Sequence, residues 1–373
     1  MAVPCESGGL LSKDIAGRYA RSGVHTFFTG GKQMHIPDNY LSPQTCAVLT
    51  AVMVPAWAVS IHKIRKELPK EKVAMMGAAA ALSFIGMMFN VPLPGGTTGH
   101  AVGGTLAAIL LGPYAACISI STALLLPALL FGDGGILAFG ANCFNMALVL
   151  PFIGCALYRL LTRRAVTEKR RIIAAGVASY VGINAAALCA AIEFGIQPML
   201  FRNAAGIPLY CPYGLSVSIP AMMGGHLTIF GIAEVVFTVL ILAFCDRVGA
   251  ADFTVDSGRS VRTASAGSPL RGVRKDSASG GRKLGVLIAV LIIFTPVGLL
   301  AEGTAWGEWS TEEVASAAGF TPAGMAKGFD WSALFPDYSV GSLPPWFGYV
   351  LSAVIGAAVL VILFKLFSQK TAR

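Results

Sequence analysis

Long apolar runs dominate this sequence of 373 residues and decide what it can fold into. Several runs exceed the ~18 apolar residues that indicate a membrane-spanning helix. Only 13% of the residues are charged, whereas a soluble globular domain typically carries about 25%. The same composition excludes intrinsic disorder. The sequence therefore predicts an all-α, polytopic membrane protein.

We expect about nine transmembrane helices, arranged as a seven-span unit followed by a two-span unit. The predicted ranges are 44–62, 73–90, 101–112, 114–131, 136–158, 171–197, 221–245, 284–301 and 347–367. The third and fourth ranges meet at Gly112-Pro113, where proline interrupts the helical hydrogen bonds. One very long helix over 101–131 is the alternative.

Basic residues follow four of the predicted helices and set the orientation of the chain. They lie within 63–72, 159–171, 247–283 and 365–373, and positively charged loops stay in the cytoplasm. The first two basic loops share a side only if an even number of helices separates them, which favours the break at Gly112-Pro113. The acidic segment 302–346 is then external, and the C-terminus is cytoplasmic.

These patterns divide the chain into four parts. Residues 1–33 are polar and lack the apolar stretch of a signal peptide, so we interpret them as a leader of doubtful reality. Residues 34–245 form the seven-span domain, and residues 246–283 form a basic linker rich in Ser and Gly. Residues 284–373 form the two-span domain with its acidic external loop. That loop either attracts cations or is simply solvated.

Met34 and His35 form a chelator if the mature chain begins at Met34. The α-amine and the backbone nitrogen of His35 close a five-membered ring with a metal ion. The same backbone nitrogen and Nδ1 of the imidazole close a six-membered ring. A planar, all-nitrogen ligand set favours Ni(II) or Cu(II). Pro37 has no N–H group and fixes the direction in which the chain leaves the site.

His100 is the best candidate for the fourth planar ligand. It follows a stretch rich in Gly and Pro at the external end of the second helix, and a histidine at membrane depth is by default a functional candidate. His226 and Glu234 are candidates for supporting the ligands. The ordinary alternatives are a solvated His35, a helix-capping or hydrogen-bonded His100 and a structural His226.

At these residues the sequence resembles the substrate-binding membrane subunit of cobalt/nickel energy-coupling-factor transporters, the CbiM/NikM type. The resemblance rests on Met-His-Ile-Pro-Asp-x-Tyr-Leu-Ser-Pro at 34–43 and Pro-Gly-Gly-Thr-Thr-Gly-His at 94–100. It continues at 106–116, 144–146 and 226–231, and residues 295–309 look like the small N-type auxiliary subunit fused behind it. Asn39 stands where the family commonly has glycine, and asparagine also tolerates left-handed turns.

The resemblance implies a function and a ligand set. It implies that Met34, His35 and His100 hold Ni(II) or Co(II) as the transported substrate, captured outside a bacterial or archaeal cell membrane, with nickel favoured by planar nitrogen ligation. It also implies a separate transmembrane coupling subunit and ATP-binding cassette ATPases as partners. The sequence has no phosphate-binding loop, so ATP hydrolysis belongs to the partners.

Two other functions compete with this interpretation. A stand-alone secondary transporter or channel for divalent cations needs coupling carboxylates in the bundle, and only Glu193 and Glu234 lie in the predicted helices. A membrane-embedded enzyme is disfavoured, because no paired carboxylates or metalloprotease motif occurs. We expect no organic cofactor and no nucleic-acid partner.

Overall fold

The structure is a computed structural model that describes residues 35–93, 97–163, 167–248, 277–301 and 304–370. Met34, the predicted leader 1–33 and residues 249–276 of the predicted linker lie outside the described residues. The all-α architecture is confirmed: across the described ranges, helices make up nearly all of the regular structure, and one two-stranded hairpin interrupts them.

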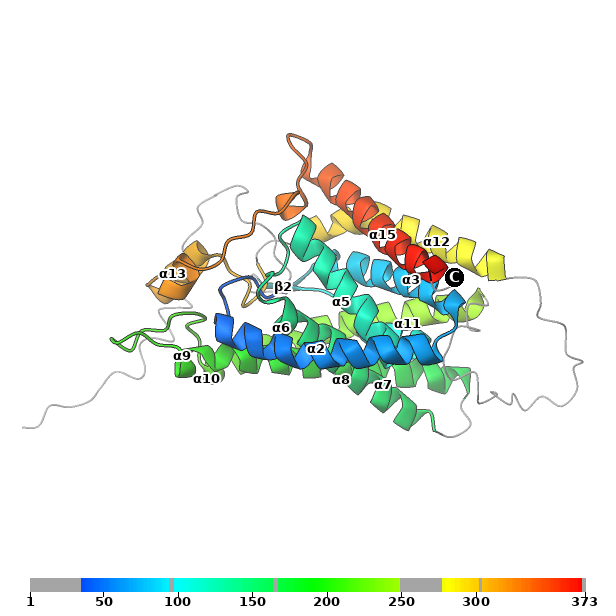
Figure 1. Ribbon diagram of the computed structural model, residues 1–373, viewed down its shortest axis with the longest axis horizontal. Coiled ribbons are helices and arrows are strands. Elements are labelled where there is room, and N and C mark those ends of the chain that lie inside the picture. Colours follow the sequence, from blue (N-terminus) through cyan, green and yellow to red (C-terminus); the bar gives the residue numbers. More distant parts are fainter. Residues whose placement is uncertain (1–34, 94–96, 164–166, 249–276, 302–303, 371–373) are drawn as a thin grey trace, which may run out of the picture. The chain divides into compact units, whose positions relative to one another are not determined.

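Figure 1 colours the elements in sequence order. They are α2 (Pro43–Glu67), α3 (Lys70–Met87), β1 (Val91–Leu93), β2 (Thr97–Gly99), α4 (Gly104–Leu111), α5 (Pro113–Leu130), α6 (Phe139–Cys143), the π-helix η1 (Phe144–Val149), α7 (Leu150–Leu161), α8 (Glu168–Gly195), α9 (Gln197–Leu200), α10 (Leu215–Gly225), the π-helix η2 (His226–Phe230), α11 (Gly231–Arg247), α12 (Ser277–Phe294), the 3-10 helix η5 (Thr295–Leu300), α13 (Thr311–Ala318), α14 (Ala323–Ala326), the 3-10 helix η6 (Pro336–Tyr338) and α15 (Pro345–Lys370).

Seven helical runs in the described part of the chain are long and apolar enough to cross a membrane. They are Pro43–Glu67, Pro113–Leu130, Phe139–Leu161, Glu168–Leu200, Leu215–Arg247, Gly281–Leu300 and Pro345–Gln369. Helix α3 adds a shorter apolar helix at the second predicted span. The third predicted span, 101–112, is helical only over the eight residues of α4, which rise about 12 Å.

The predicted break between the third and fourth spans is present. Gly112 has a φ of 89° and a ψ of 157°, a conformation that favours glycine, and Pro113 begins α5. Lys63 and Lys72 line one pocket together with Gly112, Pro113 and Arg159. The first two basic loops and the turn between α4 and α5 therefore lie at the same end of the bundle, as the charge pattern predicted.

Helix α8 lies at the centre of the first unit and packs against α7, α10 and α11. Its buried face consists largely of alanine and glycine, which allows neighbouring backbones to approach closely, as in other membrane helix bundles. At Gly182, for example, an added Cβ would lie 2.9 Å from the carbonyl oxygen of Leu150.

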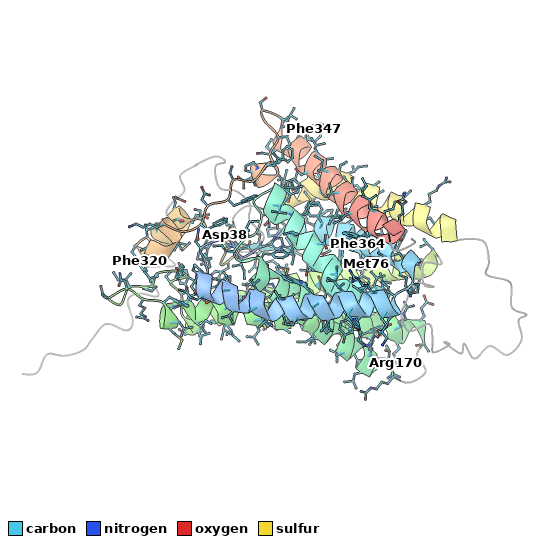
Figure 2. All side chains as sticks on the ribbon, in the orientation of Figure 1. Asp38, Met76, Arg170, Phe320, Phe347 and Phe364 are labelled. Atoms are coloured by element: carbon cyan, nitrogen blue, oxygen red, sulfur yellow. The ribbon has the colours of Figure 1, made fainter. Side chains whose placement is uncertain are left out.

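The helices from α12 to α15 form the C-terminal unit. This unit packs on α3 through α15 (Figure 1). An added Cβ at Gly77 of α3 would lie 3.0 Å from Cβ of Phe364, which Figure 2 labels beside Met76. Between η5 and α15, the predicted external segment contains α13, α14 and η6. A capping box formed by Ser310 and Glu313 begins α13. Much of this acidic segment is therefore folded.

Candidate metal site

The segment before α2 is tied to the start of α6 by polar contacts. Asp38, labelled in Figure 2, accepts hydrogen bonds of 2.8 to 3.2 Å from the backbone N–H groups of Ile136, Leu137 and Ala138. Burial raises the pKa of the Asp38 carboxyl, although these three hydrogen bonds act to lower it. Ile36 exchanges two 3.1 Å backbone hydrogen bonds with the amide of Asn142. These contacts fix the chain on either side of Pro37.

His35 is buried, with 3% of its surface exposed. Its Nδ1 lies 3.0 Å from Oδ1 of Asp133, and its Nε2 lies 3.3 Å from the sulfur of Met87. The other carboxylate oxygen of Asp133 accepts a hydrogen bond from the hydroxyl of Tyr338. Burial raises the pKa of Tyr338 well above 10, and the charge of Asp133 raises it further, so the hydroxyl keeps its proton and donates. The predicted solvated alternative for His35 is not observed.

His100 lies directly after the hairpin of β1 and β2, which pairs antiparallel with Pro92 opposite Thr98. Residues 88–93 and 97–103, between α3 and α4, are not α-helical. Glu234 of α11 holds the end of this stretch: its carboxylate accepts from the backbone N–H of Val102 at 2.7 Å and of Gly103 at 3.0 Å. Glu234 thus contacts the backbone two and three residues after His100.

The two predicted ligand histidines come together although 65 positions separate them in the sequence. Their ring centroids lie 5.2 Å apart with planes tilted by 58°. Two imidazoles that bind one ion through nitrogens at 2.0–2.1 Å have centroids separated by roughly 4.5 Å for a right-angle arrangement and roughly 6.4 Å for a linear one. The observed separation falls between these limits, while the ring nitrogens of His35 contact Asp133 and Met87.

A cavity of about 100 Å3 lies against both histidines. Its walls come from the hairpin, from the two π-helical turns through Asn145 and His226, and from the C-terminal unit through Trp306 and Glu308. His226 bonds the carbonyl of Met222 through Nδ1 at 2.9 Å. A carbonyl can only accept, so this nitrogen carries the proton and Nε2 keeps a lone pair.

The position of Asp133 bears directly on the predicted chelate. That chelate uses Nδ1 of His35, and in the structure Nδ1 faces Asp133. Binding a metal through Nδ1 therefore requires the imidazole to leave this carboxylate. Within the described ranges, no group of three or more His, Cys, Asp or Glu side chains is gathered to hold a metal. The predicted ligand set does not need one, because two of its four donors are the amine of Met34 and a backbone nitrogen.

Sequence reasoning missed the carboxylate that holds His35 and the residues that the C-terminal unit brings to the cavity. Asp133 lies in the turn between α5 and α6, flanked by Gly132 and Gly134 with φ values of 72° and 85°. An acidic residue between glycines at the predicted external end of two helices was the available signal. For Trp306 and Glu308, more than 200 residues from His35 and His100, the sequence held no comparable signal.

These features define a polytopic membrane protein in which a buried histidine, His35, and a half-buried histidine, His100, lie side by side at one cavity. Residues 35–251, more than half of the chain, match the family described as the cobalt uptake substrate-specific transmembrane region, and residues 282–371 match the PDGLE domain. The chain belongs to the cobalt uptake substrate-specific transmembrane family, which confirms the resemblance found in the sequence.

Two relatives and one solved structure extend this result. A probable fused nickel transport protein, LarMN, from Lactiplantibacillus plantarum is 45% identical over 346 residues, covering 91% of this chain and 98% of that protein. A fused nickel transport protein, NikMN, from Rhodobacter capsulatus is 47% identical over 350 residues, covering 88% and 95%. A crystal structure of a truncated transition metal transporter is 54% identical with a TM-score of 0.54, covering 57% of this chain and 99% of that chain.

Proposed function

We propose that this chain captures Ni(II) outside the cell as the substrate-specific membrane component of an ATP-driven uptake transporter. The observation that carries the proposal is that the rings of His35 and His100 lie beside one cavity with their centroids 5.2 Å apart. The similarity to fused nickel transport proteins supports nickel as the substrate, and relatives named as cobalt transport proteins make Co(II) the second candidate.

The proposed ligands are the α-amine of Met34, the backbone nitrogen and imidazole of His35, and the imidazole of His100. On capture, Nδ1 of His35 exchanges its contact with Asp133 for the ion. The planar nitrogen set favours Ni(II) over ions that prefer oxygen ligands. Glu234 supports His100 through the backbone of Val102 and Gly103, and His226 contributes to the wall of the same cavity.

The proposed partners are a transmembrane coupling subunit and two ATPases, which drive reorientation and release of the ion. The basic loops at one end of the bundle are the proposed cytoplasmic side, and the histidines open toward the outside. A stand-alone secondary transporter is the competing function. The two intramembrane carboxylates considered for it are both engaged in local contacts, Glu234 with backbone amides and Glu193 with Asn145.

The first test is the intact mass of the native protein, with bound nickel and cobalt counted on the same sample. We expect a chain that begins at Met34 and carries about one equivalent of nickel. A chain that begins at Met1 and still binds metal would show that the amine is not a ligand. His35→Ala and His100→Ala should each abolish tight nickel binding without loss of the folded bundle. Nickel binding unchanged from wild type in either variant would refute the ligand assignment.

The transport part of the proposal needs a separate assay. Nickel uptake is measured in cells that express this chain with and without the coupling subunit and the ATPases. Uptake that requires the partners and ATP supports the proposal. Undiminished uptake by this chain alone would support the secondary transporter instead.

A further inference from the structure

Three residues that line the histidine cavity each hold a buried oxygen atom with no hydrogen-bond partner in the described part of the chain. These atoms are Oδ1 of Asn90, Oδ1 of Asn145 and Oε2 of Glu308. Asn90 is 7% exposed and Asn145 is 3% exposed. A buried acceptor without a partner costs about 1–3 kcal/mol. Three of them around one cavity indicate a ligand that supplies positive charge or hydrogen-bond donors.

The amide of Asn145 has one partner on α8. Its Nδ2 donates to Oε2 of Glu193 at 2.9 Å. In this arrangement the amide nitrogen is the donor and Glu193 is the acceptor. Oδ1 is therefore the atom left for another partner, and it belongs to the π-helical turn η1, which lines the cavity.

Glu308 reaches the cavity from the C-terminal unit, and its segment is anchored there. The backbone N–H of Trp306 donates to Oγ1 of Thr97 on the hairpin at 2.9 Å. The indole of Trp306 packs edge-on against Phe194, with ring centroids 6.0 Å apart. Burial raises the pKa of Glu308, and the charge of Asp133 raises it further. A bound cation beside the carboxylate would stabilise its charged form.

We propose that Glu308, Asn90 and Asn145 form a second cation station, which holds the hydrated divalent ion through oxygen donors before the nitrogen ligands take it. Carboxylate and amide oxygens are typical ligands of hydrated divalent cations, whereas imidazole and amide nitrogens retain nickel more strongly. A cavity of about 100 Å3 has room for an ion with part of its water shell, since each water occupies about 30 Å3 in the liquid. This inference rests on the proposed function.

The rate of loading tests the station separately from the final affinity. The full chain is mixed with Ni(II), and the association rate and the saturating stoichiometry are measured. Glu308→Gln should slow association about tenfold, because a focused negative charge raises cation on-rates by about that factor, and should leave the stoichiometry unchanged. Glu312→Gln is the matched control, because Glu312 is an exposed acid of the same segment that does not line the cavity.

Glu308→Asp keeps the charge and should fall between wild type and Glu308→Gln. Equal slowing by Glu308→Gln and Glu312→Gln would mean that only the overall charge of the segment matters, and would overturn the station. An unchanged rate in Glu308→Gln would overturn it as well.

A second measurement separates the station from the nitrogen site. Mn(II), which prefers oxygen ligands, is titrated by electron paramagnetic resonance into the His100→Ala chain. One weak Mn(II) site should be present there and be lost in His100→Ala with Glu308→Gln. Mn(II) binding that does not depend on Glu308 would refute the station. Unchanged nickel binding by His100→Ala would refute the proposed nitrogen ligands. The Mn(II) titration would still test the oxygen donors separately.

Discussion

At the scale of single residues, the site depends on side chains that orient the two histidines. Asp133 contacts Nδ1 of His35, the nitrogen that the proposed chelate uses, and Glu234 holds the backbone that follows His100. A group that fixes the surroundings of a ligand, as Glu234 does for His100, strongly affects metal affinity without touching the metal. Both carboxylates bind groups that are distant in the sequence, so their roles follow from the fold.

Replacing Glu234 by glutamine should weaken nickel binding about tenfold, the lower end of the effect measured for residues that support metal ligands. The amide presents a donor where the carboxylate accepts from two N–H groups. The measurement is a nickel binding isotherm on the purified chain. Thr238→Val is the control, because Thr238 is equally buried one turn later on α11. If both variants bound as wild type, Glu234 would not support the site.

Two π-helical turns and one hairpin build the cavity at the scale of elements. Such turns are rare and occur mainly at functional sites. Here η1 carries Asn145 and η2 carries His226, and each interrupts a long apolar run. The hairpin is non-helical backbone between α3 and α4, which is tolerated in a bundle only where protein or a cavity surrounds it.

Contact between β2 and η2 should be sensitive to a single methyl group. A Cβ on Gly99 would lie 2.7 Å from ring atoms of Phe230, too close for any real contact. Gly99→Ala should therefore lower stability by about 1–3 kcal/mol and displace His100, with a lower melting temperature and weaker nickel binding.

Gly214→Ala is the matched control for this substitution. A Cβ at Gly214 meets nothing within 4 Å, and its φ of −75° suits any residue. A Gly99→Ala chain with the stability and affinity of the Gly214→Ala chain would show that the hairpin can shift freely away from Phe230.

At the scale of the whole molecule, the C-terminal unit completes the surroundings of the histidines. Tyr338 bonds Asp133, and the hydroxyl of Tyr349 donates to the carbonyl of Met88 at 3.0 Å. Asn39 exchanges two hydrogen bonds with the backbone of Phe329, at 2.7 and 2.8 Å. These contacts join the segment around His35 to a unit that begins more than 230 residues later.

Variants of Asn39 separate its role in the left-handed turn from its hydrogen bonds to Phe329. Its φ of 67° is left-handed, so Asn39→Gly keeps the turn but removes both hydrogen bonds to Phe329. The Phe329 amide should then exchange with solvent faster, while nickel binding stays close to wild type. Asn39→Ala also adds a backbone strain of about 1–2 kcal/mol and should weaken nickel binding. Unchanged exchange at Phe329 in the Gly variant would show that Asn39 does not hold the two units together.

The sequence by itself determined the class of fold, the positions of the helices and the break at Gly112-Pro113. Apolar length and charge asymmetry are local properties that follow directly from the solvent the chain must face. It also indicated His100 and Glu234, because polar residues at membrane depth are costly and rarely without function, and it indicated His35 as part of the predicted chelate. The chelate at Met34 stays a prediction, since Met34 lies outside the described residues.

Only the tertiary structure decided what surrounds these residues. Asp133 contacts His35 across 98 positions, Tyr338 contacts Asp133 across 205 positions, and Glu308 lines the cavity from the C-terminal unit. The eight-residue length of α4 and the π-helical turns also depend on neighbouring elements. Such features arise from packing between distant segments. Local periodicity does not determine that packing. The apolar pattern of a segment shows that the segment is buried but not which partner covers it.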